Sequence, residues 1–221
     1  MNELSESEIK QLASQLRTPE GSAGIDVGHK MHETNINMTM TAVKALNLSD
    51  GDAILEIGHG NAAHLTRILN QAKNIHYAGL DISQTMQEEA QRINADLVGD
   101  GKASFHLYDG QQMPFEDNQF DKIMTTNTIY FWDRPVGLLN EAHRVIKPNG
   151  LFSICFAEKS FMKELPFAQY NFQLYSTEDV HDIVKQTSFE AVDTDTEVEQ
   201  VKSKDGLNVD RLFTVVTLKK E

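Results

Sequence analysis

The sequence predicts an α/β fold built on a mostly parallel sheet, and three observations support this prediction. From Ala53 onward, short apolar runs alternate with segments of helical periodicity. Turns that contain Gly or Asp separate these segments, as in βαβ units. The 221 residues are 40% hydrophobic and 24% charged, which is close to the composition of ordered globular domains. We therefore expect a single domain over 1–221, with a helical cap or lid over 1–50 and the core over 51–221.

The pattern along the chain places each element in order. Two helices are expected before the first strand, near 6–16 and from Thr34 to about 46, with a loop at 17–24 because this stretch contains Pro and Gly. The last two strands are expected to pair antiparallel. The prediction is a Rossmann-like seven-stranded, mostly parallel sheet with one antiparallel edge strand, helices on both faces and an N-terminal helical cap. Strands are expected near 53–57, 76–80, 103–107, 121–125, 151–157, 189–195 and 211–218, and core helices near 62–71, 84–97, 135–146 and 177–186.

The charge of the chain excludes several classes of partner. The formal net charge of -13 repels phosphates, and no basic patch offsets it, so we expect no nucleic-acid partner. No apolar run approaches the roughly 20 residues that span a bilayer, so no integral membrane contact is expected.

The acidic N-terminal segment is unlike a signal peptide, and the single cysteine, Cys155, suits a reducing compartment. These features predict a cytoplasmic protein.

Chemistry is expected in the loops that follow the strands, because open α/β sheets bind ligands at the carboxyl ends of their strands. Gly58 and Gly60 follow the first predicted strand, where missing side chains would let a ligand approach the backbone and the next helix N-terminus. A Gly-x-Gly pair alone is equally consistent with a tight strand-to-helix turn that binds no ligand. Glu56, however, ends an apolar strand, where a carboxylate needs a cationic or hydrogen-bonding partner.

Two more acids are predicted at the same edge of the sheet. Asp81 ends the second strand, and it lies near the interval of about 20 residues at which a carboxylate binds ribose hydroxyls in nucleotide sites. Asp109 follows the third strand, directly before Gly110, where it can accept hydrogen bonds from an adenine amino group. Together with Glu56, these residues predict a site lined by three carboxylates.

The glycine spacing alone fits two cofactors. Residues 58–63 also satisfy the Gly-x-Gly-x-x-Gly/Ala pattern of nicotinamide dinucleotide binding, so an NAD(P)-dependent oxidoreductase is an alternative. Glu56 argues against it, because a carboxylate repels the anionic pyrophosphate. S-adenosylmethionine has no phosphate, and its sulfonium and ammonium groups are cationic. The Asp109–Gly110 pair and the closing pair of strands also favour S-adenosylmethionine.

With these motifs the chain resembles the class I S-adenosylmethionine-dependent methyltransferases, in particular the small-molecule group typified by the ubiquinone/menaquinone C-methyltransferases. The resemblance extends over about 53–156, with its motifs in the expected order, which is more specific than any single motif. The matching segments are 55–60 at the first strand, 79–83 at the second, 113–121 before the fourth, and 141–150 before the fifth.

The resemblance implies a role for each matching residue. Glu56 and the backbone of Gly58 and Gly60 would lie near the methionine end of the cofactor, and Asp81 would bind the ribose. Two positions depart from the family pattern: Ala62 stands where a third glycine is common, and a bulky His59 separates the two glycines. Ile82, Asp109 and Gly110 would lie at the adenine ring. Asn127 would lie at the border between the cofactor and the acceptor.

The acceptor side of the site is less well defined by the sequence. Tyr130 is the one catalytic candidate, since it could orient an acceptor, although packing is the more common role of an aromatic residue there. No metal is expected, because His29 and His32 lack further ligands at suitable spacing. The N-terminal helices and 161–175 are candidate lids. We expect a small-molecule acceptor, with a non-catalytic cofactor-binding module as an alternative because no general base is evident. The oligomeric state is not predicted.

Overall fold

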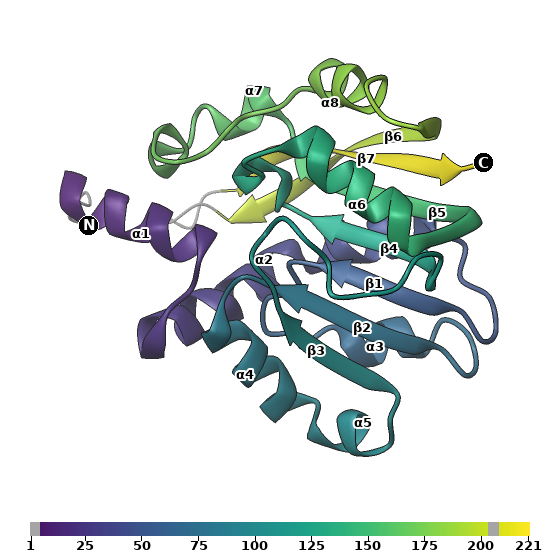
Figure 1. The fold of residues 1–221 in the computed structure, drawn as a ribbon. Coiled ribbons are helices and arrows are strands. Elements are labelled where there is room, and N and C mark those ends of the chain that lie inside the picture. Colours follow the sequence, from purple (N-terminus) through teal and green to yellow (C-terminus); the bar gives the residue numbers. More distant parts are fainter. Residues whose placement is uncertain (1–4, 203–207) are drawn as a thin grey trace.

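The computed structural model of the chain describes residues 5–202 and 208–221, in which one seven-stranded sheet lies between layers of helices (Figure 1). The strand order is β3-β2-β1-β4-β5-β7-β6, and β1 to β5 pair in parallel. β7 runs antiparallel to both β5 and β6, so the antiparallel pairing lies at one edge, as predicted. The strands are β1 (Ala53–Ile57), β2 (His76–Asp81), β3 (Ala103–Leu107), β4 (Phe120–Thr126), β5 (Ile146–Ala157), β6 (Phe189–Lys202) and β7 (Asn208–Lys220).

Helices cover both faces of the sheet. Figure 1 shows α3 behind the sheet and α6 in front of it. α2 packs against α4 and against β4 and β5, whereas α6 packs against β5 and α8. Within the described residues, none of the helices is long and apolar enough to cross a membrane. The helices are α1 (Glu6–Arg17), α2 (Gly21–Ala45), α3 (Leu65–Leu69), α4 (Gln84–Ile93), α5 (Ala95–Gly99), α6 (Pro135–Val145), α7 (Lys159–Met162) and α8 (Thr177–Val184), with 3₁₀ turns η1 (Ile129–Phe131) and η2 (Pro166–Gln169).

The central strands form the core because both of their faces are covered. Adjacent residues of one strand are both fully buried, for example Ile54 and Leu55 on β1. This two-sided burial explains why these strands read as continuous apolar runs, which is typical of parallel sheets. A carboxylate at the end of such a strand, as at Glu56, is therefore placed in a dry environment. The fold holds the predicted site residues against the most buried part of the molecule.

The structure corrects the expected boundary between the first two helices. α2 begins at Gly21 rather than near Thr34, so residues 18–20 are the whole connection. Contacts with the start of α4 hold this turn: the Ser83 hydroxyl donates to the Pro19 carbonyl oxygen at 2.5 Å, and the Gly21 N–H donates to Thr85 Oγ1 at 3.1 Å. These tertiary contacts outweigh the low helix propensity of glycine. The cap is consequently longer and more firmly docked than the sequence pattern indicates.

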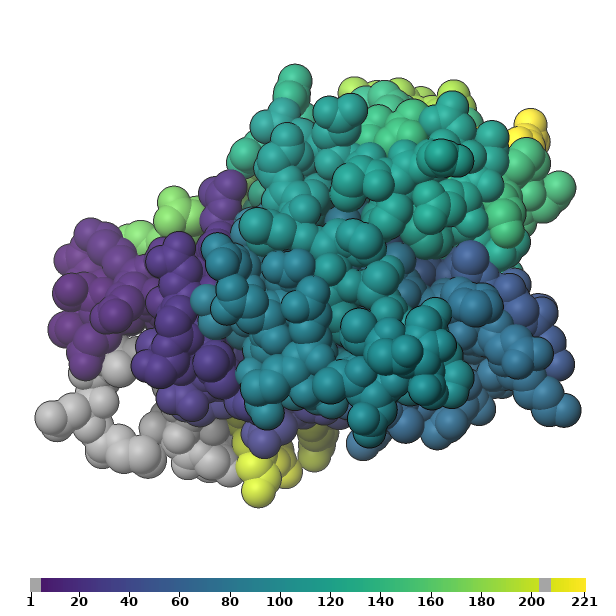
Figure 2. Space-filling model, turned by 60° about the horizontal axis from the view of Figure 1, so that its bottom comes forward, coloured from purple at the N-terminus to yellow at the C-terminus, as the bar shows by residue number. Residues whose placement is uncertain are grey.

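Glycine inside α2 permits this close docking. A methyl group at Gly28 would lie 2.7 Å from Met86 Sδ, so a larger residue there would require the Met86 side chain to move. Figure 2 shows the N-terminal helices, in purple, against the teal surface of the middle of the chain.

The boundaries of the other expected helices and strands shift less. The helix expected at 84–97 divides at Asn94, and β5 begins at Ile146, directly after α6.

Candidate functional site

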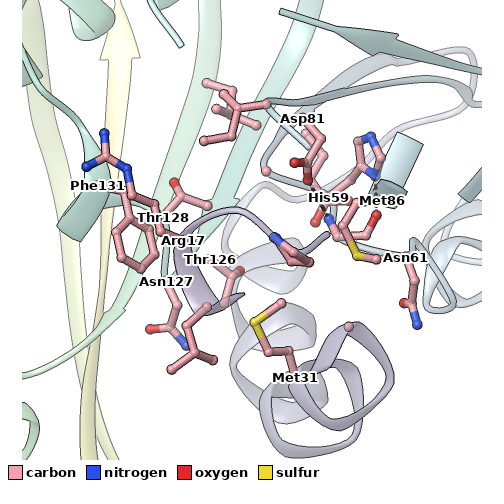
Figure 3. Close-up of a pocket in the computed structure, with 18 of the residues that line it drawn as sticks. Arg17, Met31, His59, Asn61, Asp81, Met86, Thr126, Asn127, Thr128 and Phe131 are labelled. Atoms are coloured by element: carbon pink, nitrogen blue, oxygen red, sulfur yellow. Dashed lines mark hydrogen bonds between the residues drawn. The ribbon is translucent and has the colours of Figure 1, made fainter. Parts of the chain in front are cut away.

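A cavity of about 340 Å³ lies at the carboxyl ends of β1 to β4, beneath α1 and α2 (Figure 3). All eight residues that the sequence predicts for cofactor binding line it, which brings together side chains from four strand ends. The N-terminal helices supply the opposite wall, although the sequence did not indicate which of their residues would face inward. The eight residues are Glu56, Gly58, Gly60, Asp81, Ile82, Asp109, Gly110 and Asn127.

The turn after β1 requires glycine at its first position. Gly58 has a φ of 74°, and a methyl group there would overlap the Thr128 side chain from the loop after β4. Its N–H donates to the Leu80 carbonyl oxygen at 2.7 Å, which joins the turn to β2. Both the backbone conformation and the close approach of Thr128 exclude a side chain. The bare backbone at this point is what opens the cavity floor.

Asp81 links the glycine turn to the start of α4. One carboxylate oxygen accepts from the Gly60 N–H at 3.0 Å, and the other accepts from the Ser83 N–H at 2.9 Å. The side chain is buried, and this burial raises its pKa, while His59 and the two N–H groups act in the opposite direction. Each carboxylate oxygen can accept a further hydrogen bond. Asp81 therefore faces the cavity with acceptor capacity for ligand hydroxyls.

Asp109 and Gly110 form the rim at the end of β3. Asp109 Oδ1 accepts from the backbone N–H groups of Gln111 and Gln112, each at 2.8 Å, and these bonds lower its pKa. Gly110 has a φ of 79°, and a methyl group there would sit 3.5 Å from Ile82 Cγ2. Ile82 and Gly110 thus lie close together, and the exposed Asp109 stays ionised beside them.

Glu56 finds its partner inside the chain. Its carboxylate lies 2.8 Å and 3.1 Å from His64 Nε2, and it accepts from the Tyr77 hydroxyl at 2.5 Å. Burial alone would raise its pKa, but the His64 ring and these hydrogen bonds together hold the pKa below its usual value. The acid is therefore ionised and compensated before any ligand enters. The sequence indicated the need for a partner but could not identify His64.

The bulky His59 is accommodated by a glycine on the neighbouring strand. A side chain at Gly79 would overlap the His59 ring, which also packs edge-on against Phe105 with ring centroids 5.0 Å apart. The ring lies against the sheet, with Nδ1 2.7 Å from the Gly60 carbonyl oxygen. This contact assigns the proton to Nδ1. Ala62, at the other unusual position, adopts a φ of 48°, a conformation that favours glycine.

Asn127 and Tyr130 are tied to each other behind the cavity wall. Asn127 Oδ1 accepts from the Ala157 N–H at 3.1 Å and lies 3.0 Å from the Tyr130 hydroxyl. That hydroxyl also lies 2.8 Å from the Ala157 carbonyl oxygen, and burial raises the pKa of Tyr130 far above its usual value. Asn127 lines the cavity, but Tyr130 does not. These hydrogen bonds hold the buried Tyr130 hydroxyl against Asn127 and the end of β5, and its part in orienting an acceptor stays a prediction.

The N-terminal helices add lining residues that sequence reasoning did not identify. Arg17 and Met31 face the cavity, and so does His32, whose ring stacks on that of His64 with centroids 5.9 Å apart. Burial and the neighbouring His64 lower the pKa of His32, so its ring is neutral at pH 7. Over residues 5–202 and 208–221, no group of three or more His, Cys, Asp or Glu side chains is placed to hold a metal ion. Helical periodicity alone could not have shown which face of α2 meets the cavity.

Comparisons with known proteins agree with this geometry. The family model described as a methyltransferase domain matches residues 55–154. A biotin biosynthesis bifunctional protein BioHC from Teredinibacter turnerae is 27% identical over 157 residues, which cover 65% of this chain and 27% of that protein. A ubiquinone/menaquinone biosynthesis C-methyltransferase from a Ruegeria species is 33% identical over 101 residues, covering 45% of this chain and 40% of that protein. The matches therefore span less than half the length of these two relatives.

Solved structures share the fold at lower identity. A geranyl diphosphate C-methyltransferase from Streptomyces coelicolor, crystallised with Mg²⁺, geranyl diphosphate and S-adenosyl-L-homocysteine, superposes with a TM-score of 0.70 at 11% identity. The match covers 94% of this chain and 88% of that protein. At this identity the likeness establishes the fold alone.

Proposed function

We propose that the chain transfers the methyl group of S-adenosylmethionine to a small-molecule acceptor, because residues 55–154 match the model of a methyltransferase domain and the fold is shared with a geranyl diphosphate C-methyltransferase. One observation carries this proposal: residues from four strand ends, predicted separately from the sequence, line a single cavity at the edge where α/β sheets bind ligands. The net charge of -13 favours a small acceptor over a nucleic acid.

The residues at the cavity fit the chemistry of the cofactor. Asp81 offers acceptor capacity for ribose hydroxyls, and the rim formed by Ile82, Asp109 and Gly110 suits an adenine ring with its amino group. The exposed backbone of Gly58 and Gly60 would lie beside the methionine end. The Glu56 carboxylate is already paired with His64. It would therefore be a negative charge that is held in place beside the methionine end. This arrangement favours a cationic nucleoside over a dinucleotide with an anionic pyrophosphate.

When bound, S-adenosylmethionine supplies an electrophilic methyl group on a cationic sulfur. The protein's contribution is to align the acceptor with that methyl group and to exclude water. Leu16 and Met31, from the N-terminal helices, and Phe131, after β4, provide apolar surface for this purpose. Transfer of that methyl group to the acceptor would leave S-adenosylhomocysteine, and an acceptor that carries a proton at the methylated atom would release it. No reacting group of the protein has to bond covalently to the acceptor.

Calorimetric titration tests the cofactor assignment. We expect S-adenosylmethionine and S-adenosylhomocysteine to bind, and Asp81→Asn to weaken both by about tenfold to a hundredfold, since a hydrogen bond to a charged group contributes about 1.5–3 kcal/mol. Asp100→Asn is the matched control, because Asp100 is an exposed acid paired with Lys102 outside the cavity. Binding of NAD(P) without any signal for S-adenosylmethionine would instead establish the oxidoreductase alternative.

Transfer itself is tested with S-adenosylmethionine that carries a labelled methyl group. Incubated with the chain and a metabolite extract, it should yield labelled small molecules, whose identification would name the acceptor. Heat-treated protein serves as the control for background labelling. If the cofactor binds tightly but no molecule becomes labelled, the chain is better described as a non-catalytic binding module.

A further inference from the structure

The cavity has two chemically different ends. Figure 3 shows Asp81, His59 and Met86 at one end, and Arg17, Thr128 and Phe131 at the other. The first end holds the carboxylates that suit the ribose and adenine of the cofactor. The second lies between α1 and the loop after β4, next to Gly58, where the methionine end of the cofactor would meet the acceptor. Its composition therefore bears on the acceptor.

Arg17 is the one lysine or arginine among the described residues that line the cavity. It makes a single contact there, from Nη2 to Asp133 Oδ1 at 3.1 Å, and both side chains are exposed, Arg17 by 37% and Asp133 by 69%. Exposed pairs of this kind contribute at most about 1 kcal/mol. A guanidinium has five N–H donors, so most remain free for a ligand. His32 does not compete for an anion, because its ring is neutral at pH 7.

The surface around Arg17 includes an aromatic wall. Phe131 lies at this end of the cavity together with Thr128, and Leu16 and Met31 add apolar surface to the cavity lining. Phe131 is held from behind by Phe172, with ring centroids 4.6 Å apart, and Phe172 in turn packs against Phe167. These contacts fix the Phe131 ring, which makes it a firm wall for a flat or branched apolar group. A cation beside such a wall is complementary to a molecule with an anionic group on an apolar body.

We infer that the acceptor is an organic anion, with a carboxylate or phosphate that Arg17 binds and an apolar body that lies against Phe131. This inference rests on the proposed function, since it takes the acidic end of the cavity as the cofactor site. The acceptor's anionic group would displace Asp133 or share the guanidinium with it. Arg17 is then a specificity-determining residue.

Calorimetry with simple probes tests this inference on the intact chain. The protein is saturated with S-adenosylhomocysteine and titrated with benzoate, with phenyl phosphate and with the neutral benzamide. We expect saturable binding of at least one anion, at least tenfold tighter than that of benzamide. The two anionic arms distinguish a carboxylate from a phosphate acceptor. Arg17→Gln should weaken anion binding by about tenfold, and Arg17→Lys should restore part of it because the charge returns.

The controls separate this inference from the proposed function. Lys185→Gln removes a cation from an exposed ion pair on α8, and it should leave anion binding unchanged. If neither anion binds, or if Arg17→Gln binds them as tightly as the unmodified chain, the inference is wrong. It is also wrong if Arg17→Gln weakens S-adenosylhomocysteine instead, because Arg17 would then serve the cofactor. Failure of S-adenosylhomocysteine to bind the unmodified chain overturns the proposed function, and this inference with it.

Discussion

Two pairs of side chains line the same cavity, the buried His64–Glu56 contact and the exposed Arg17–Asp133 ion pair, and they differ in nearly every physical respect. His64 and Glu56 meet at 2.8 Å at the strand end, with side chains exposed by only 7% and 3%. Arg17 and Asp133 meet at 3.1 Å at the mouth, where both side chains remain in water. Removing one partner of the buried pair leaves an uncompensated charge in a dry environment, whereas water replaces either partner of the exposed pair.

This difference matches the proposed division of the cavity into a cofactor end and an acceptor end. At the cofactor end, Glu56 and Asp81 already have donors within the chain, so the binding surface is formed before the ligand arrives. Asp109 is likewise fixed by backbone N–H groups. At the acceptor end, Arg17 is held by one exposed contact and can move to a ligand. The first region is built for a constant ligand, and the second for exchange.

The largest expected effect comes from breaking the buried pair. His64→Ala should lower the free energy of unfolding by about 3–5 kcal/mol, because it leaves the buried Glu56 carboxylate with the Tyr77 hydroxyl but without its imidazole partner. Urea unfolding at pH 7 measures this change. His76→Ala is the matched control: it removes an exposed histidine at the first residue of β2, and it should change stability by less than about 0.5 kcal/mol.

The double variant Glu56→Gln with His64→Ala identifies the cause. If the uncompensated charge is responsible, the neutral amide should recover a large part of the lost stability. Equal losses in His64→Ala and in the double variant would show that packing of the imidazole ring matters more than its charge. Equal stability of His64→Ala and His76→Ala would remove the contrast between the two ion pairs.

The next effect concerns the backbone of the cofactor end. Gly58→Ala should destabilise the chain by about 2–4 kcal/mol, since it combines an unfavourable positive φ with an overlap on Thr128. Gly51→Ala shares the positive φ but meets no neighbouring atom, so it should cost only about 1 kcal/mol. Adding Thr128→Ser to Gly58→Ala removes the overlapping methyl group. Urea unfolding of these variants should show partial recovery, and no recovery would mean that the overlap is relieved elsewhere.

A smaller effect is expected from pH. Burial lowers the pKa of His59 in the folded chain, more strongly than Asp81 and Glu56 raise it. Because the unfolded state then binds the proton more readily, the contribution of His59 to stability is complete above a pH of about 6.5 and declines below it. His59→Asn keeps an N–H for the Gly60 carbonyl oxygen but does not titrate. When the pH falls from 7.5 to 5.5, the free energy of unfolding of the His59→Asn variant should decrease by about 1 kcal/mol less than that of the unmodified chain. Parallel pH curves for the two proteins would contradict this.

The sequence predicted one end of the cavity far better than the other. Gly58, Asp81 and Asp109 follow strands, and strand ends can be located from apolar runs and turn residues, so their convergence followed from topology. His64 could not be paired with Glu56, because no spacing rule relates a strand end to the first turn of the next helix. Arg17 depends on how α1 docks, which is decided by tertiary contacts such as that of Ser83 with Pro19. Local pattern carries no information about such contacts.

The smallest effect on stability is expected at the mouth. Asp133→Asn breaks the exposed pair and should change the free energy of unfolding by less than about 1 kcal/mol, a change that salt should make smaller still. Yet Asp133 lies beside Trp132, the single tryptophan of the chain, which lines the cavity and is 6% exposed. Movement of α1 away from the loop should therefore alter tryptophan fluorescence without altering stability. A loss of stability as large as that of His64→Ala would show that Arg17 and Asp133 hold the fold together, and that both ends of the cavity are equally rigid.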